Sequence, residues 1–492
     1  MGKRKRNQQS LCNTWGRQGL SDLPSPPNDK QADVQLYDLV LPDELEVTVD
    51  TLRTLAQNPD IIKSKACREL RTAVYDFRQA CPTGLNSTNG TNLTARVSGA
   101  LADGKYQDAL VLLAEMRIRG ETPKLGALCR WVRDLDVVVG LSMQIDGVSK
   151  VTETRSAKDK ELLRVLDFIL RVTGPTDSNT TDTSSSSDPI ALQAVWNLRD
   201  PNATPRNTRQ TVVDKTIFTA CPPGLRKRFR TLETTAGPDR KPPNLHPAIL
   251  YASRDDAVVL GPPPATSSHK HPFVPDLRLI KDVLTSDECT SIIAAAETVG
   301  FVPDAPIRGV DGSETSVLAH NFYWIVDRAF HDKLWERVRS HVPADSAGRK
   351  VRGINRRFRV YRYVPGAEYR CHIDGAWPPS GIHPVTDAYQ YDSSPPNARQ
   401  SSLFTFLIYL NDEFENGETS FLIPSVREGV MNAYPVKPVM GSVAVFPHGE
   451  AQGALLHEGT GVSKGAKYII RTDVEYDVDA SSQSFADCVY TI

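Results

Sequence analysis

The stretch from Tyr361 to Asp374 limits the possible folds of this 492-residue chain more than any other part of its sequence. Side chains alternate in type over residues 360–364, which is the period of a β-strand, and Pro365-Gly366 ends the run as a turn does. After the turn, His372 and Asp374 stand two positions apart, so in a strand both side chains leave the same face. The stretch therefore predicts a strand, a turn and a second strand that carries two metal ligands.

A third ligand is expected from His457, which lies in the segment 455–459, shortly before a strand-like run at 467–474. Two histidines and one carboxylate on one side of an ion leave three positions open, which is the arrangement of non-haem Fe(II) oxygenases. Zinc hydrolases use similar ligands but need fewer open positions. Because an isolated H-x-D pair is common by chance, its surroundings decide the interpretation.

Those surroundings contain further motifs in a fixed order. The pattern Y-x-x-G-x-x-Y-x-x-H-x-D is matched in full by Tyr363, Gly366, Tyr369, His372 and Asp374. A strand-like run follows at 405–410, then the turn G-E-T-x-F at 417–421, and finally a histidine and a lysine at positions 457 and 467. In these motifs the C-terminal two-fifths of the chain resembles the 2-oxoglutarate- and Fe(II)-dependent dioxygenases of the prolyl 4-hydroxylase type.

The resemblance implies both a fold and an activity. The fold is a double-stranded β-helix, and the ligands of Fe(II) are His372, Asp374 and His457. The cosubstrates are 2-oxoglutarate and O₂, with ascorbate expected as reductant. The activity implied is hydroxylation of a C–H bond with release of succinate and CO₂.

The distal carboxylate of 2-oxoglutarate needs a cation, because a buried anion without a partner is costly. By resemblance this cation is Lys467, while strand alternation places Arg471 on the same face. Arg471 has Asp473 and Glu475 close by in sequence. We therefore expect Lys467 to bind the carboxylate and Arg471 to form a structural ion pair.

Three further residues match family positions around the cosubstrate. The resemblance implies that Tyr363 and Thr405 add hydroxyl hydrogen bonds and that Tyr369 contacts the cosubstrate or helps to close the site. Two other histidines, His383 and His448, are expected to be solvated loop residues. A Pro-rich insert at 377–396 is long enough to form a substrate lid.

The fold class expected for the whole chain is α+β, with a jelly-roll barrel and supporting helices after a mainly α-helical N-terminal part. Periodic apolar residues predict helices between about 48 and 172. The expected divisions are a disordered basic N-terminus (1–32), an α-helical domain (33–172), a flexible linker (173–190), a segment of unassigned fold (191–270), the dioxygenase domain (271–480) and a C-terminal tail (481–492).

One helical segment, residues 100–123, resembles a single unit of a pentatricopeptide-type helical hairpin. Tyr106 opens the second helix, Met116 lies near its end, and Gly120 and Pro123 close it. Such repeats generally need about three units to bury a continuous core. We therefore favour a structural role for this helix pair over recognition of RNA.

Net charge and the distribution of apolar residues limit the expected binding partners and cellular location. A net charge of −1 argues against DNA or an anionic membrane as a partner of the whole protein. No apolar run approaches the roughly 18 residues of a membrane span, and the N-terminus lacks a signal-peptide pattern, so an intracellular protein is expected. The basic run Lys3–Arg6 is typical of either a nuclear localisation signal or a solvated tail. By alternation, Cys371 faces away from the metal ligands and packs inside the protein.

Three functions remain open on sequence alone. The first is a dioxygenase that hydroxylates a protein or peptide residue, a substrate class drawn only from the family analogy. The second is a dioxygenase that acts on a small molecule or, less favoured, a nucleic acid. The third is a non-catalytic interaction scaffold, which the complete set of ligands and the carboxylate anchor disfavour.

Overall fold

The computed structural model describes residues 39–80, 92–137, 139–141, 155–177, 188–202, 206–219, 221–236, 247–302, 307–308, 314–449 and 451–478. The basic run Lys3–Arg6, the expected tail 481–492 and most of the expected linker, residues 178–187, lie outside these ranges. The chain forms two compact units. Described residues 39–80 belong to the first unit and those from 92 to 478 to the second.

The first unit is a small group of helices. It consists of α2 (Pro42–Ala56), α3 (Pro59–Ile62), the 3-10 helix η1 (Lys65–Cys67) and α4 (Arg68–Ala80). A proline at the first helical position starts α2, and Glu44 accepts a hydrogen bond from the backbone of Leu41 at 3.2 Å. None of the side chains described in this unit is buried.

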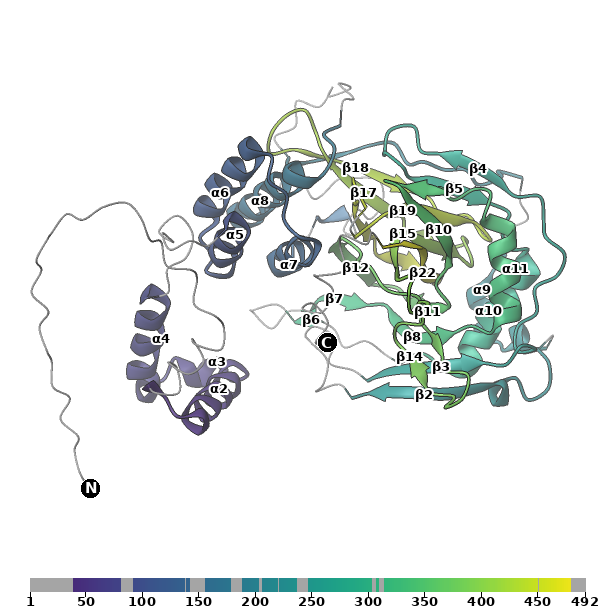
Figure 1. Ribbon diagram of the computed structural model, residues 1–492, viewed down its shortest axis with the longest axis horizontal. Coiled ribbons are helices and arrows are strands. Elements are labelled where there is room, and N and C mark those ends of the chain that lie inside the picture. Colours follow the sequence, from purple (N-terminus) through teal and green to yellow (C-terminus); the bar gives the residue numbers. More distant parts are fainter. Residues whose placement is uncertain are drawn as a thin grey trace, which may run out of the picture. The chain divides into compact units, whose positions relative to one another are not determined.

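The second unit begins with four helices, α5 (Leu93–Ala102), α6 (Tyr106–Arg119), α7 (Leu125–Leu135) and α8 (Ala157–Thr173) (Figure 1). Asn92 caps α5 through Ala95 N at 2.9 Å. Gly120 ends α6 in the left-handed conformation that glycine adopts readily. The helix pair expected at 100–123 is thus present, while its resemblance to a pentatricopeptide unit stays a prediction.

Two large β-sheets follow these helices, together with two pairs of short strands. The smaller sheet consists, in spatial order, of β1 (Ile190–Leu192), β18 (Met431–Val436), β17 (Thr419–Pro424), β20 (Leu456–Gly459), β12 (Ala367–His372), β7 (Glu314–Leu318) and β6 (Ile307–Arg308). The larger sheet consists of β2 (Phe229–Thr235), β3 (Ala248–Ser253), β8 (His320–Ile325), β11 (Arg357–Tyr363), β22 (Lys467–Asp477), β15 (Gln400–Tyr409), β19 (Val443–Pro447), β5 (Arg278–Lys281) and β4 (Ser267–Lys270), with β10 (Arg349–Ile354) also paired to β22.

Shorter elements complete the second unit. They are α9 (Thr208–Val213), the 3-10 helices η4 (Thr216–Phe218) and η5 (Leu225–Arg228), α10 (Ser286–Val299), α11 (Arg328–Val338), and the short strands β9 (Asp345–Ser346), β13 (Gly381–Ile382), β14 (Tyr389–Gln390), β16 (Glu415–Asn416) and β21 (Val462–Lys464). Among the short strands, β13 pairs with β14 and β16 pairs with β21. A capping box at 285–288 starts α10, because Thr285 Oγ1 accepts from Glu288 N and Glu288 accepts from Thr285 N.

Side chains along β11 alternate between the two faces of the larger sheet and so pack into two different cores. Phe358 and Val360 point outward into a core shared with α10 and α11. Tyr361 and Tyr363 point inward into a core between the two sheets. The two sheets therefore face each other as a jelly-roll, which confirms the expected α+β fold.

The helices α5–α8 are part of the same packed unit as the barrel. Their apolar side chains form one continuous core with residues on the outer face of the smaller sheet, including Ile373, Leu422 and Leu456. The compact units of the structure thus divide near residues 82–92 and not at the linker expected at 173–190. The physical reason is that the apolar faces of these helices are covered by the sheet.

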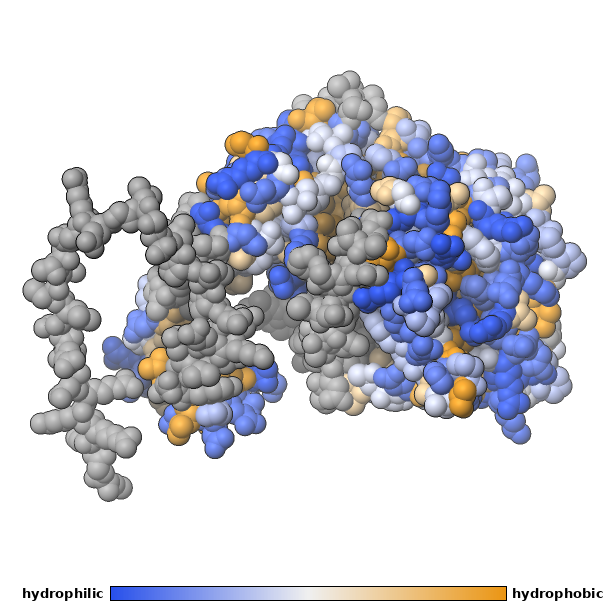
Figure 2. Space-filling model, in the orientation of Figure 1, coloured by the Kyte–Doolittle hydropathy of each residue, from blue (hydrophilic) through white to orange (hydrophobic). Residues whose placement is uncertain are grey.

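The segment 191–270, which the sequence left without a fold, supplies parts of both sheets. It contributes β2, β3 and β4 to the larger sheet, and Trp196 forms a bridge to Val436 of the smaller sheet. On the face of the second unit that Figure 2 shows, hydrophilic residues predominate, in keeping with apolar side chains held in the cores. Within the described residues, no helix is both long enough and apolar enough to cross a membrane.

Candidate metal centre

Two neighbouring strands of the smaller sheet bring the expected metal ligands together. His372 ends β12 and pairs directly with His457 of the antiparallel strand β20. Directly opposed residues in such a ladder have side chains close together, and these two rings have centroids 4.2 Å apart. Asp374 follows two residues after His372. One ligand atom from each of the three residues lies within 4.8 Å of the others, and this is the only such cluster in the described part of the chain.

The hydrogen bonds of the two imidazoles leave the correct atoms for a metal. His372 Nδ1 donates to Arg370 O at 2.8 Å, and His457 Nδ1 donates to Leu455 O at 3.3 Å. The Nε2 atoms then face the Asp374 carboxylate, at 3.4 Å for His372 and 3.6 Å for His457. Burial lowers the pKa of His457 to about 3, so its ring is neutral and its Nε2 offers a lone pair. Lone pairs and a carboxylate that meet at one place fit a divalent metal ion.

Asp374 stays ionised although it is 5% exposed. Burial raises the pKa of its carboxyl group, but opposing interactions, of which the charge of Arg471 is the largest, outweigh burial and hold the pKa well below its ordinary value. Arg471 Nε lies 3.1 Å from Asp374 Oδ1. The arrangement therefore keeps the carboxylate in the form that binds metal.

The three residues line a pocket on the inner face of the barrel. Every site residue expected from the sequence lies along it: His372, Asp374, His457, Lys467, Tyr363, Thr405 and Tyr369. The structure thus brings all seven together in one pocket. Their individual roles remain proposals.

Lys467 is a buried cation in this pocket. It is 1% exposed, it stands opposite Tyr363 on the neighbouring strand, and its Nζ lies 5.0 Å from the centre of the Tyr363 ring. Among the described residues its hydrogen-bond partner is the neutral carbonyl of Gly417, at 2.8 Å. Burial lowers the pKa of Lys467 to about 7. Such a side chain is suited to receive an anionic group inside the barrel.

Thr405 makes different contacts from those expected. Its hydroxyl donates to Asp374 Oδ2 at 2.7 Å and lies 2.7 Å from His448 Nδ1. Since a threonine hydroxyl has one proton, Thr405 in this arrangement has none to give a cosubstrate carboxylate. Thr405 thus contacts the candidate metal ligand.

Thr419 is a pocket residue that the sequence analysis missed. It pairs with Gly459 of β20 and is 1% exposed. Its hydroxyl accepts from Tyr409 at 2.9 Å, which leaves its own proton for a bound anion. The signal was available, because Thr419 is the threonine of the G-E-T-x-F turn and an alternating position of a barrel strand.

Alternation explains the side on which Cys371 lies but not the position of Tyr369, because the register between β12 and β20 shifts between Tyr369 and His372. The ring of Tyr369 packs 4.4 Å from that of His372, between centroids. Cys371 points to the other side of the strand and joins the core under the helices, as expected. On that side its thiol donates to Glu458 at 3.4 Å, and burial raises the pKa of Glu458 to about 8.

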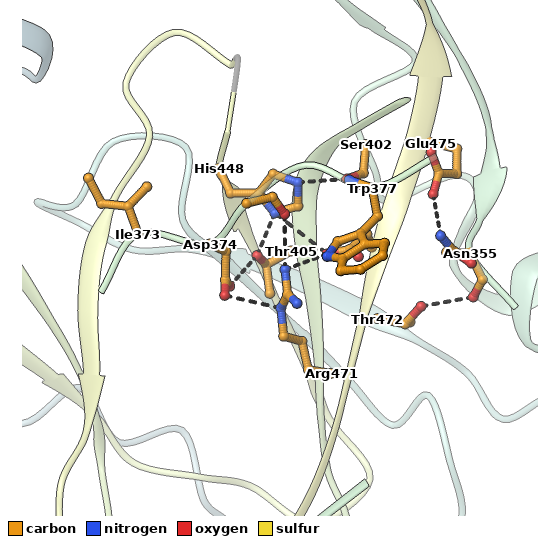
Figure 3. A network of polar contacts seen from close by, with 12 residues as sticks. Asn355, Ile373, Asp374, Trp377, Ser402, Thr405, His448, Arg471, Thr472 and Glu475 are labelled. Carbon is orange, nitrogen blue, oxygen red and sulfur yellow. Dashed lines mark hydrogen bonds and ion pairs between the residues drawn. The ribbon is translucent and has the colours of Figure 1, made fainter. Parts of the chain in front are cut away.

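Of the expectations for Arg471, His448 and His383, the one for His448 is wrong, because His448 is not a solvated loop residue (Figure 3). Arg471 bonds Asp473 at 3.0 Å, as expected, but also contacts Asp374. His448 is completely buried, because its backbone amide continues the β15–β19 ladder by donating to Leu403 O at 2.9 Å. His383 lies apart from the pocket and accepts from Thr386 N at 3.1 Å in its own loop.

One family model matches the part of the chain that contains this pocket. Residues 358–472 match the family model of the 2OG-Fe(II) oxygenase superfamily. The C-terminal part of the chain therefore contains a 2OG-Fe(II) oxygenase domain, a class that uses Fe(II), 2-oxoglutarate and O₂. No curated protein matches this sequence.

Solved structures similar to the chain include three prolyl hydroxylases. The collagen prolyl hydroxylase of Paramecium Bursaria Chlorella virus-1 is 20% identical over 41% of this chain and 97% of its own, with a TM-score of 0.27. A prolyl-4-hydroxylase of Pseudomonas putida is 16% identical over 40% and 92%, with a TM-score of 0.25. A prolyl hydroxylase of Trichoplax adhaerens, in complex with a hypoxia inducible factor oxygen degradation domain peptide fragment, is 14% identical over 43% and 87%, with a TM-score of 0.27.

Proposed function

We propose that this protein is an Fe(II)- and 2-oxoglutarate-dependent dioxygenase that hydroxylates a C–H bond with release of succinate and CO₂. His372, Asp374 and His457 would hold the metal. The observation that carries the proposal is that two imidazole Nε2 atoms face one ionised carboxylate in a pocket that also contains the buried ammonium of Lys467. The family match of residues 358–472 supports it independently.

When bound, Fe(II) with 2-oxoglutarate and O₂ would supply an oxidant able to attack an unactivated C–H bond. The protein's own residues bind and orient. Lys467 holds the distal carboxylate of the cosubstrate, with hydroxyl hydrogen bonds from Tyr363 and Thr419. The Nδ1 hydrogen bonds of His372 and His457 fix both rings with Nε2 toward the metal position. Burial of the pocket walls limits access of water.

The substrate that we propose is a protein or peptide, hydroxylated at a prolyl-type position, with ascorbate as reductant. Resemblance to the prolyl 4-hydroxylase motifs supports this choice. Aromatic and arginine side chains form a series from the pocket wall to the 377–396 insert. An extended peptide bound along this series would contact both aromatic rings and positive charges. In it, Arg359 lies 4.8 Å from the ring of Tyr361 and 5.2 Å from that of Tyr323, and Arg357 lies 4.2 Å from the rings of Tyr323 and Trp377.

The proposal is tested by incubating the protein with Fe(II), 2-oxoglutarate, ascorbate and a library of proline-containing peptides. We expect a 16 Da mass increase on a subset of peptides, with one succinate formed for each product. The matched control is Asp374→Ala, which should form neither. Mass increases only on small molecules or oligonucleotides would favour the alternative substrates, and absence of succinate from folded protein would favour a scaffold.

A further inference from the structure

A chain of four hydrogen bonds links the backbone of the insert to the candidate metal ligand (Figure 3). Ser402 Oγ lies 2.9 Å from Trp377 N and 2.9 Å from His448 Nε2. His448 Nδ1 lies 2.7 Å from Thr405 Oγ1, which lies 2.7 Å from Asp374 Oδ2. The side chains of Ser402, Thr405 and His448 belong to residues that are 0% exposed. These three side chains are therefore shielded from water, which cannot replace a missing partner among them.

The direction of these bonds follows from the end at Asp374. An ionised carboxylate can only accept, so the proton of Thr405 is donated to Asp374 Oδ2. Thr405 must then accept from His448, which places a proton on Nδ1 of that ring. Burial lowers the pKa of His448 to about 3, so the ring is neutral and its Nε2 carries a lone pair.

The hydrogen bond at the Trp377 end of this series is consistent with the same direction. A backbone amide can only donate, so Ser402 Oγ accepts from Trp377 N. The proton of Ser402 is then available for His448 Nε2, which accepts because Nδ1 carries the ring proton. All four bonds thus point from Trp377 toward Asp374, and one tautomer of His448 satisfies both ends.

We propose that His448 is a positioning residue that acts through Thr405 to hold Asp374 in the orientation needed for binding metal. The imidazole fixes the rotation of the Thr405 hydroxyl, and that hydroxyl fixes Oδ2 of the carboxylate. Arg471 holds the other oxygen, with Nε 3.1 Å from Oδ1. Asp473 also faces His448, with Oδ1 3.6 Å from Nδ1, and supports the same tautomer.

This inference rests on the proposed function, and Co(II) binding without oxygen or cosubstrate tests both separately. We expect wild-type protein to bind one Co(II) and Asp374→Ala to bind none. Thr405→Val, which keeps the shape but loses the hydroxyl, and His448→Gln, which loses the donor to Thr405, should each weaken Co(II) binding by about 10- to 100-fold. Both should also change the visible absorption spectrum of bound Co(II), which reports on its ligands.

Conservative variants distinguish positioning from a general structural role. Thr405→Ser keeps the hydroxyl and should bind Co(II) with nearly wild-type affinity and spectrum. His448→Asn keeps an N–H near the position of Nδ1, so it should lose only the Ser402 contact and weaken binding by about two- to tenfold. Ser402→Ala removes the same contact and should weaken Co(II) binding as much as His448→Asn does. Thermal unfolding of the metal-free proteins shows whether the His448 variants fold. If they do not fold, Ser402→Ala takes their place in the test.

A double variant tests whether His448 acts through Thr405. Once Thr405→Val has removed the hydroxyl, adding His448→Gln should weaken Co(II) binding by no more than about another threefold. Wild-type affinity in Thr405→Val or His448→Gln, equal losses in His448→Asn and His448→Gln, or fully additive losses in the double variant would overturn the positioning role. Wild-type protein that binds no Co(II) would instead overturn the proposed function.

Discussion

At the scale of single residues, burial of Lys467 disfavours the positive charge that its proposed role requires. Its ammonium is 1% exposed and bonds a neutral carbonyl, so burial lowers its pKa to about 7. The charged form is the one that attracts a carboxylate, and it is lost as pH rises through this pKa. A bound dicarboxylate would favour the charged form again.

We therefore expect the Michaelis constant for 2-oxoglutarate to rise as pH increases above about 7. Lys467→Arg should flatten this dependence, because a guanidinium stays charged throughout the range. Lys467→Ala should raise the constant by about ten- to a hundredfold. Initial rates of succinate formation between pH 6 and 9 provide the measurement. A flat wild-type profile together with an unaffected Lys467→Ala would show that the anchor lies elsewhere.

Arg471→Ala is the matched comparison for Lys467→Ala, since both cations lie on the same face of β22. Because Arg471 contacts Asp374 and Asp473, its loss should weaken Co(II) binding more than affinity for 2-oxoglutarate. Parallel titrations of the two variants check this expectation. A larger effect of Arg471→Ala on the cosubstrate would transfer the anchor role to Arg471.

The sequence predicted the residues whose position depends on local periodicity. His372 and Asp374 share a strand face because of their spacing, and Cys371 faces away for the same reason. The sequence did not predict the burial of His448, which depends on pairing between β15 and β19. A histidine after a proline has the local pattern of a loop, and only the neighbouring strand shows otherwise.

At the scale of elements, α8 is attached to the barrel by a buried ion pair. Arg171 Nε donates to Asp167 Oδ2 at 2.8 Å, and its NH2 group donates to the carbonyls of Ser425 and Arg427 at 2.7 and 3.0 Å. Asp167 Oδ2 also accepts from Gly429 N at 2.8 Å. The pair therefore ties the helix to the turn between β17 and β18.

Arg171→Ala should lower the free energy of unfolding by about 3–5 kcal/mol, because it leaves the Asp167 carboxylate buried without its charged partner. The double variant Asp167→Asn/Arg171→Met should lose less, since no unpaired charge remains. Arg117→Ala is the control, because Arg117 pairs with Glu428 of the same turn at the surface and should cost less than about 1 kcal/mol. Denaturant titration measures the free energy of unfolding of all three variants. A loss for Arg171→Ala no larger than that of the control would show that the buried ion pair does not tie α8 to the barrel.

Helix α7 supports the end of β12, beside two of the three candidate metal ligands. Cys129 Sγ donates to Ile373 O at 3.6 Å, and Asp136 forms an ion pair with Arg370. The amphipathic pattern predicted a helix in this region. It did not predict the partner of the helix, because periodicity indicates which face is apolar but not what covers it.

At the scale of the whole molecule, the second unit has helices on the outer face of each sheet and a third core between the sheets. The helices α5–α8 cover the smaller sheet and α10 and α11 the larger (Figure 1). The sequence predicted the barrel, whose motifs are local, but expected residues 33–172 to fold separately. The polar composition of 173–190 indicated a linker, while the shared core beyond it depends on contacts between remote segments.

Proteolysis tests this organisation in the full-length protein. Composition predicts cleavage between about 173 and 190, and the shared core predicts that the two resulting pieces stay associated under native conditions. Gel filtration of the cleaved protein, with denaturing electrophoresis of each peak, checks the outcome. Pieces that separate without denaturant would show that α5–α8 and the barrel are independent domains.

The most direct test of the account is anaerobic titration of the metal-free protein with Fe(II) in the presence of 2-oxoglutarate. We predict one Fe(II) bound per chain and a weak visible charge-transfer band that needs both Fe(II) and 2-oxoglutarate. Asp374→Ala should remain folded, because the lost side chain lines an existing pocket and Arg471 keeps Asp473 as its charged partner, yet it should show no band. No band from folded wild-type protein, or an undiminished band from Asp374→Ala, would contradict the assignment of His372, Asp374 and His457 as the metal site.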